Sequence, residues 1–214
     1  MGFYYTEEEK MSDTVIVLQD ECILTASGKA GKLPKIDRVS RIPIEPFGDT
    51  FEQWKAALKE YNEEYLPKSL KIVLPASYSS ARITQVPYAV GRQLSKMAKN
   101  VVDEHKGEDI ADYSVVQSDK KQGVCLCCGS AQNDVIKQIL DFCTELKITV
   151  KEISIPMEGY LKLLSQSRVY KNKTAIFLLF EENSVISVLY KEGMCLYTTR
   201  SRIFSEPGNL KFRY

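Results

Sequence analysis

The chain has 214 residues, of which 44% are hydrophobic and 27% charged, and its net charge is +1. This composition is that of a globular protein with one large domain or two small ones. Because Lys and Arg are interspersed with Asp and Glu, the charge pattern gives no argument for nucleic acid as a partner. No apolar run reaches the roughly 18 to 20 residues that cross a bilayer, and the N-terminus has no apolar signal core, so we expect a cytoplasmic protein without direct membrane insertion.

The first third of the chain predicts a compact α/β unit after a charged lead-in at residues 1–13. Alternating and β-branched segments predict strands at residues 13–18, 22–26 and 39–44, joined as an antiparallel meander. A helix follows, because Phe51, Trp54, Leu58, Tyr61 and Tyr65 recur at spacings of three and four. A short apolar strand is expected at residues 70–74.

The middle of the chain predicts a small α+β insert. Its expected elements are a strand at 79–86, a helix at 90–104, strands at 113–117 and 123–128, and a helix at 132–146. A strand at 151–155 and a helix at 157–165 follow. The chain then forms a second meander, with strands expected at 174–180, 185–190 and 194–199. After a loop at 205–208, a further strand is expected at 210–214. The two meanders, at residues 13–45 and 174–204, are similar in architecture.

The six cysteines are Cys22, Cys125, Cys127, Cys128, Cys143 and Cys195. Three of them lie in one apolar segment of strand character, so we interpret them as buried free thiols in a reducing compartment rather than as disulfide partners. A zinc site is the sharper alternative. However, there is no CxxC pair, and His105 is the only histidine.

Several short motifs, taken in order, resemble those of a known family. They are Ile72-Val-Leu-Pro75 before the insert, Arg82 with Val86-Pro87 at its start, Asp112-Tyr113-Ser-Val-Val116 within it, and the hairpin Thr174 to Tyr190 followed by Gly193 and Arg200. The chain resembles the actin and FtsA class, and within it the type IV pilus assembly family PilM. The cytoplasmic part of the GspL secretion proteins is a close variant of the same plan.

The resemblance implies an α/β fold: an actin-like, ribonuclease H-like lobe with an inserted α+β subdomain of the 1C type. The implied boundaries are 14–75 for the first lobe, 76–147 for the insert, 148–172 for the return to the first lobe, and 173–214 for a partial second lobe. It also implies a docking groove for the N-terminal peptide of a PilN-like inner-membrane protein, at the inner face of the cell membrane. The candidate partner-binding residues are Tyr78, Arg82, Tyr88 and Arg92. Unpaired sheet edges would favour self-association.

An actin-like nucleotide site uses two hairpin turns with a glycine after an Asp, because glycine lets backbone N–H groups approach the phosphates. Here the first turn has Asp20 and no glycine, and the second has Glu181 and Glu182 before Ser184. We therefore expect a degenerate module without nucleotide, metal or catalytic residue, in which Asp20, Glu181 and Ser184 mark the former site. The alternative is an active actin-like ATPase of pilus assembly or cell division that binds Mg-ATP there.

Overall fold

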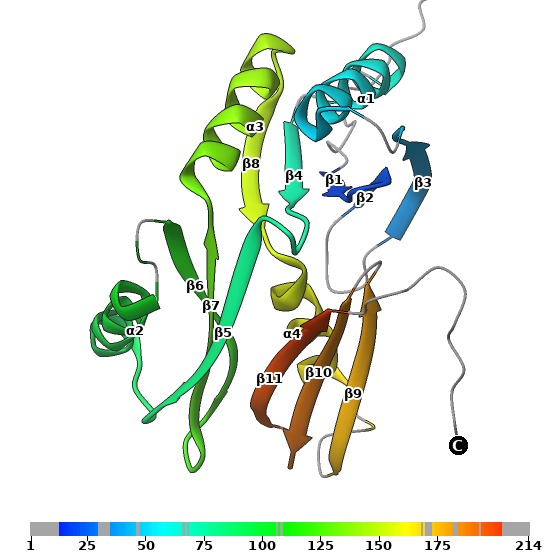
Figure 1. Ribbon diagram of the computed structural model, residues 1–214. Coiled ribbons are helices and arrows are strands. Elements are labelled where there is room, and N and C mark those ends of the chain that lie inside the picture. The colour runs from blue at the N-terminus through cyan, green and yellow to red at the C-terminus, as the bar shows by residue number, and fades with distance from the viewer. Residues whose placement is uncertain are drawn as a thin grey trace, which may run out of the picture. The chain divides into compact units, whose positions relative to one another are not determined.

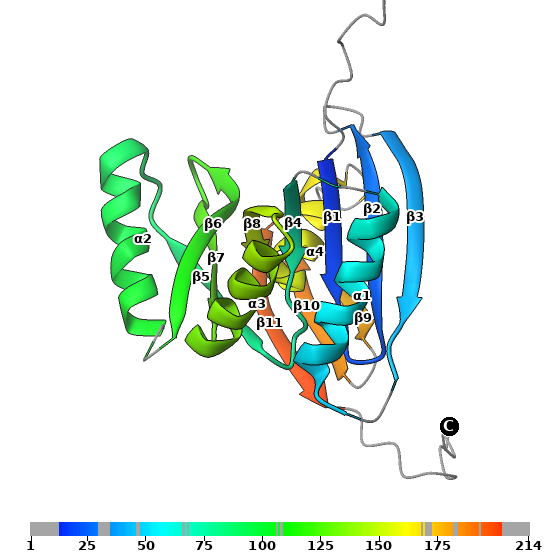
Figure 2. The same cartoon turned by 90° about the horizontal axis from the view of Figure 1, so that it is seen from above.

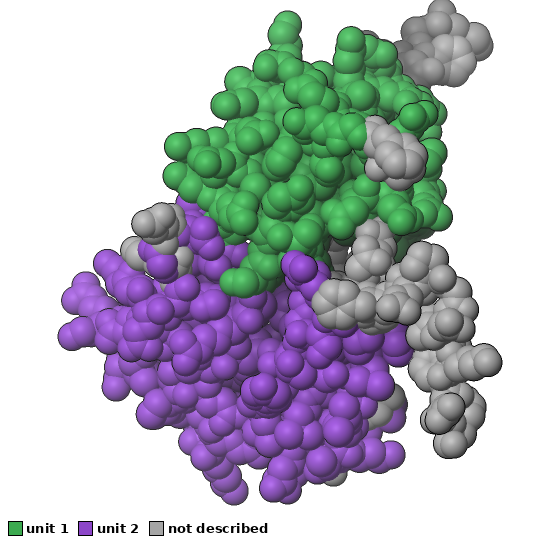
Figure 3. Space-filling model, viewed as in Figure 1, with its two compact units in different colours: residues 1–80, 131–156 green, residues 81–130, 157–214 purple. Residues whose placement is uncertain are grey.

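The computed structural model describes residues 13–29, 35–45, 48–65, 67, 69–105, 107, 109–167, 169, 173–181, 184–192 and 194–202. They fall into two compact units (Figure 3). Unit 1 comprises Met1–Ser80 and Ala131–Pro156, and unit 2 comprises Ala81–Ser130 and Met157–Tyr214. The predicted strand at 210–214 lies outside the described residues. The four predicted subdomain boundaries stay a prediction.

Unit 1 is built on a five-stranded sheet in the order β3-β2-β1-β4-β8 (Figure 1). Its strands are β1 (Asp13–Leu18), β2 (Cys22–Lys29), β3 (Lys35–Pro43), β4 (Ser69–Val73) and β8 (Thr149–Ser154). The first three form the expected antiparallel meander, with Leu18 opposite Ile23. Strand β4 is parallel to both β1 and β8.

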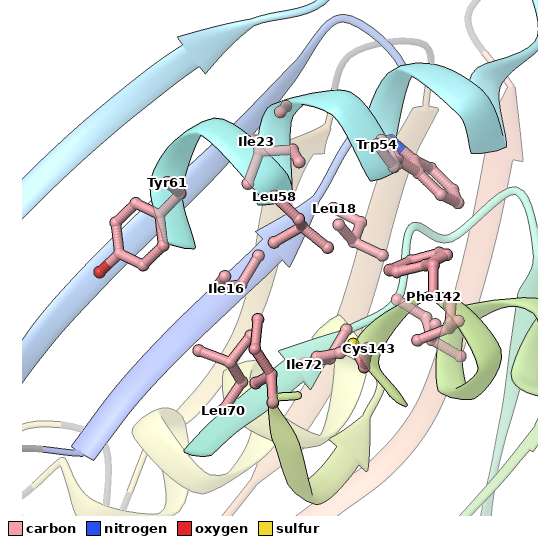
Figure 4. Packing of buried hydrophobic residues seen from close by; sticks show 14 of the residues in the cluster. Ile16, Leu18, Ile23, Trp54, Leu58, Tyr61, Leu70, Ile72, Phe142 and Cys143 are labelled. Atoms are coloured by element: carbon pink, nitrogen blue, oxygen red, sulfur yellow. The ribbon is translucent and has the colours of Figure 1, made fainter. Parts of the chain in front are cut away.

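Two helices, α1 (Thr50–Tyr65) and α3 (Asn133–Glu145), contribute to the core of unit 1 (Figure 2). Helix α1 begins where the Asp49 carboxylate accepts a hydrogen bond from the backbone N–H of Phe51 at 2.8 Å, a typical N-cap. Apolar side chains of both helices meet those of β1, β2 and β4 in one core (Figure 4). The fully buried members include Ile16, Leu18, Ile23, Trp54, Leu58, Leu70, Ile72 and Ile139.

The buried face of α3 packs in the core of unit 1. Its buried residues Val135, Ile139, Phe142 and Cys143 are members of the unit 1 core. Periodicity predicted the helix, but it does not say which sheet the apolar face of a helix covers.

Unit 2 contains a second, three-stranded sheet in the order β5-β7-β6. It is formed by β5 (Ser79–Val86), β6 (Ile110–Asp119) and β7 (Gly123–Ala131), with α2 (Gly91–His105) on one face. The central strand β7 directs Val124, Leu126 and Cys128 into the core shared with α2. All six cysteines of the chain are buried, which agrees with the prediction that they pack in the interior.

The remaining elements of unit 2 are α4 (Pro156–Gln166) and a meander of β9 (Thr174–Glu181), β10 (Ser184–Lys191) and β11 (Met194–Arg202), ordered β11-β10-β9. Strand β10 alternates, with Ile186, Val188 and Tyr190 buried. This period of two is what the sequence pattern predicted. Among the described residues, no helix is long and apolar enough to span a membrane.

Candidate functional site

The turn between β1 and β2 is closed by its own hydrogen bonds. The backbone N–H of Gln19 donates to the carbonyl oxygen of Cys22 at 3.0 Å, and the Cys22 thiol donates to Gln19 Oε1 at 2.9 Å. The indole Nε1 of the buried Trp54 donates to the carbonyl oxygen of Gln19, also at 2.9 Å. The base of the turn is therefore held by groups of the protein itself.

The tip of this turn consists of Asp20 and Glu21, and both side chains are exposed. The Ser77 hydroxyl donates to Asp20 Oδ1 at 3.3 Å, and the backbone N–H of Ile44 donates to the carbonyl oxygen of Glu21 at 2.9 Å. Neither tip residue has the positive φ that brings successive N–H groups toward an anion. Two adjacent carboxylates place negative charge at the tip, which opposes a phosphate.

The turn between β9 and β10 is described only at its two sides. Glu181 ends β9 and pairs with Ser184, the first residue of β10, whereas Glu182 and Asn183 lie outside the described residues. Ser184 is only 2% exposed, and its hydroxyl accepts a hydrogen bond from Arg200 Nε at 3.0 Å. The Ser184 hydroxyl is thus hydrogen-bonded to a residue of β11.

Tyr78, one of the predicted partner-binding residues, is half-buried in unit 1. Its ring lies against the rings of Phe51 and Trp54, with centroids 5.6 Å and 5.7 Å away. The backbone N–H of Tyr78 donates to the carbonyl oxygen of Pro75 at 3.1 Å, a turn that folds the side chain back onto α1. Its ring belongs to the aromatic cluster beside the β1–β2 turn.

The other three predicted docking residues belong to unit 2 and are exposed. Arg82 lies on β5, Tyr88 follows that strand, and Arg92 is in the first turn of α2. The pKa of His105, at the last residue of α2, is lowered, first by burial and then by the positive charge of Arg82. The charge of Arg82 therefore acts on the imidazole of His105 at the end of α2. Arg82, Tyr88 and Arg92 follow one another along the connection from β5 to α2.

A link between Cys125 and Cys195 was not foreseen from the sequence. The carbonyl oxygen of Cys195, on β11, accepts hydrogen bonds from Gln85 Nε2 at 3.2 Å and from the Cys125 thiol at 3.7 Å. The hydrogen bond with Cys195 and burial both raise the pKa of the Cys125 thiol, and burial raises the pKa of Cys127 to about 12. Thiols in this state are protonated near neutral pH and are poor nucleophiles.

The described residues contain no group of three or more His, Cys, Asp or Glu side chains placed to hold a metal ion. Asp20 therefore belongs to no such group among these residues. The β1–β2 turn has neither a glycine nor a residue of positive φ that would direct backbone N–H groups toward a phosphate.

Comparison with solved structures shows that the chain has the actin-like ATPase fold, as expected. A structure of the PilM-PilN type IV pilus biogenesis complex superposes with a TM-score of 0.68 at 14% identity, over 88% of this chain and 60% of that one. The cytoplasmic domain of EpsL, an inner-membrane component of the type II secretion system of Vibrio cholerae, gives 0.52 at 14% identity, over 89% and 71%. A Bacteroides thetaiotaomicron protein with an actin-like ATPase fold and unknown function gives 0.57 at 11% identity, over 95% and 75%.

The chain thus spans about 60% of the length of the chain that it matches in the PilM-PilN complex. No family model matches the sequence, and no curated protein matches it significantly. At these identities the likeness establishes the fold, and it relates the chain structurally to PilM-like and EpsL-like proteins.

Proposed function

We propose that the chain is a non-catalytic actin-like scaffold that docks an inner-membrane protein of a type IV pilus or of a type II secretion-like system. Two of the similar solved structures come from such systems, one of them as a PilM-PilN complex. The observation that carries the non-catalytic part is the β1–β2 turn, whose tip bears two exposed carboxylates and no left-handed residue.

The argument against nucleotide binding at this turn rests on both electrostatics and geometry. A triphosphate in this fold needs backbone N–H donors and a cation to offset its charge. At this turn the N–H of Gln19 is already bonded to Cys22, and the nearest side chains at the tip are acidic. A surface that no longer holds nucleotide can still serve as a rigid platform for a protein partner.

The first experiment is a titration with a fluorescent ATP analogue in the presence of Mg²⁺. We expect no saturable binding in the micromolar range, for the wild type and for Asp20→Ala alike. Asp141→Ala, which removes an exposed carboxylate from α3, is the matched control. Saturable micromolar binding that Asp20→Ala abolishes and Asp141→Ala preserves would show an active nucleotide site.

The second experiment tests docking by fluorescence anisotropy. The probe is a labelled peptide with the sequence of the N-terminus of a PilN-like inner-membrane protein. We expect saturable binding that the charge reversals Arg82→Glu and Arg92→Glu weaken by about tenfold or more, the loss of a charge-assisted contact. Lys120→Glu, in the exposed β6–β7 turn, is the control and should bind like the wild type. Absence of binding by the wild type would refute the docking proposal.

A further inference from the structure

Helix α2 of unit 2 has an exposed positive face. Arg92, Lys96 and Lys99 recur at spacings of four and three, so they lie on one side of the helix. All three residues are exposed. The opposite side of α2 packs on the sheet β5-β7-β6 through residues that include Ala98 and Val102 (Figure 1). The positive face is therefore directed away from the sheet that carries the helix.

This face lies in a stretch of chain that has no acidic residue. The charged residues of the segment 81–102 are Arg82, Arg92, Lys96 and Lys99. The whole chain, by contrast, is nearly balanced, with 29 Lys and Arg against 28 Asp and Glu. In the part of the chain that the structure describes, none of the three basic residues of α2 forms an ion pair. The positive face ends at Asp103, one turn beyond Lys99, so it spans the first ten residues of the helix.

The charges of α2 run against the helix dipole. A helix is stabilised by acidic residues in its first turn and by basic residues in its last turn. The other three helices of the described residues have an acidic residue in the first turn, namely Glu52 in α1, Asp134 in α3 and Glu158 in α4. The first turn of α2 has none and contains Arg92, while Asp103 lies in its last turn. Helix stability therefore does not favour this arrangement, which indicates that the positive face serves to bind an anionic partner.

The residues just before the helix narrow the kind of partner. Tyr88 is 39% exposed and Val90 is 65% exposed, and neither is charged. The backbone of a nucleic acid or an acidic peptide offers these side chains little apolar surface. A lipid layer, in contrast, accepts cations among its headgroups and aromatic and apolar side chains at the boundary with the acyl chains. We propose that the α2 face, which comprises Tyr88, Val90, Arg92, Lys96 and Lys99, binds the surface of an anionic lipid membrane.

The strength of this contact follows from its charge. Each Lys or Arg close to an anionic membrane strengthens binding by about fivefold, so three of them give about a hundredfold preference over a neutral membrane. Contact of this strength is reversible, and stable attachment requires a second signal. Here the inference rests on the proposed function, because the docked inner-membrane protein supplies that second signal. The α2 face then determines which side of unit 2 faces the lipid.

Co-sedimentation of the full chain with sucrose-loaded vesicles at millimolar lipid tests the proposal. We expect binding to vesicles of phosphatidylcholine with about one-third phosphatidylglycerol, about a hundredfold weaker binding to pure phosphatidylcholine, and loss of binding at about 0.5 M salt. The double variant Lys96→Gln/Lys99→Gln should bind about 25-fold more weakly and keep its circular dichroism, since Gln and Lys have similar helix propensities. The matched control Lys120→Gln/Lys121→Gln removes the same charge from the exposed β6–β7 turn and should bind nearly as well as the wild type.

Several outcomes would overturn the proposal. They are a wild type that shows no preference for phosphatidylglycerol, and equal losses in the two double variants. A wild type that ignores the vesicles but binds a DNA duplex or a polyglutamate peptide through Lys96 and Lys99 would assign the α2 face to another polyanion.

Binding of the PilN-like peptide separates this proposal from the proposed function. The variant Lys96→Gln/Lys99→Gln retains Arg82 and Arg92, so it should bind the peptide as the wild type does. Peptide binding without vesicle binding by the wild type would overturn the membrane contact alone. Vesicle binding without peptide binding would refute the docking of the inner-membrane protein and leave the membrane contact standing.

Discussion

Trp54 and Gln19 are joined by a hydrogen bond of 2.9 Å from the indole Nε1 to the backbone carbonyl oxygen. The bond connects helix α1 to the end of β1, 35 residues earlier in the chain, and it lies directly beneath the Asp20 tip. Trp54 is fully buried and is the single tryptophan of the chain. This one side chain therefore couples core packing to the shape of the turn.

Replacing Trp54 by Phe should destabilise the protein by about 2–4 kcal/mol, because it leaves the part-buried carbonyl of Gln19 without its donor and creates a small cavity. The measurement is urea-induced unfolding followed by circular dichroism. Tyr78→Phe keeps the aromatic ring of the neighbouring cluster and should cost less than about 1 kcal/mol. Equal losses for the two variants would contradict the role given to the indole hydrogen bond.

Helix α3 offers a test of its place in the unit 1 core. Ile139 is fully buried, while the adjacent Leu140 is 41% exposed. Ile139→Ala should lower the free energy of unfolding by about 2–5 kcal/mol, and Leu140→Ala by less than about 1 kcal/mol. If Leu140→Ala were the more damaging variant, α3 would bury the opposite face, and its assignment to this core would fail.

Gly123 begins β7 with a φ of +100°, and a Cβ added there would lie 2.5 Å from the backbone carbonyl oxygen of Val86. Gly123→Ala should therefore cost about 2–3 kcal/mol or more, because both the backbone conformation and the contact with β5 are disturbed. Gly91 also has a positive φ, of +56°, but a Cβ there would meet nothing within 4 Å. Gly91→Ala should cost only about 1 kcal/mol in thermal or urea unfolding. Similar losses at the two glycines would argue against close approach of β5 and β7 at this point.

The buried thiols predict a loss of stability at high pH. Burial raises the pKa of Cys127 to about 12 and that of Cys143 to about 11, above the ordinary value of 9.0. The unfolded chain then loses these protons at a lower pH than the native protein does. The stabilisation is complete below about pH 9, and it falls by up to about 1.4 kcal/mol per pH unit for each thiol as the pH rises toward the native values.

Urea unfolding under reducing conditions, at a series of pH values from about 8 to 10.5, measures this slope. In Cys143→Ala, the fall of the unfolding free energy with pH should be less steep, by an amount that corresponds to nearly one proton. Val135→Ala removes core volume from the same helix without removing a thiol, so it should lower stability at every pH and leave the slope unchanged. An unchanged slope in Cys143→Ala would show that this thiol does not titrate differently in the two states.

Most elements could be predicted because their side chains alternate or recur regularly. Strands β1 and β5 match their predicted ranges at both ends, and the helices agree within one or two residues. The chief misses were at the ends of peripheral strands. Strand β3 starts at Lys35 rather than at residue 39, because its mostly exposed side chains leave no apolar alternation to read, and pairing with β2 defines it instead.

The candidate site was less predictable than the fold. Sequence showed that the Asp20 turn lacks glycine, but the closure of the turn by Trp54 and Cys22 depends on tertiary packing. Tyr78 was grouped with Arg82 by chain position, whereas a turn at Pro75 places its ring on α1. Proximity in the sequence thus showed that these residues lie along one stretch of chain between β4 and α2. It did not show which side chains each of them contacts.

Unit 2 is made of two separate stretches of chain, and the carbonyl oxygen of Cys195 unites them by binding Cys125, 70 residues away, and Gln85, 110 residues away. During synthesis on the ribosome, β5 and β7 emerge long before this acceptor does. The segment that intervenes, residues 131–156, supplies the last pieces of unit 1. The order of translation therefore allows unit 1 to be completed first. The sheet β5-β7-β6 can form its hydrogen bonds to the Cys195 carbonyl oxygen only after β11 has been synthesised.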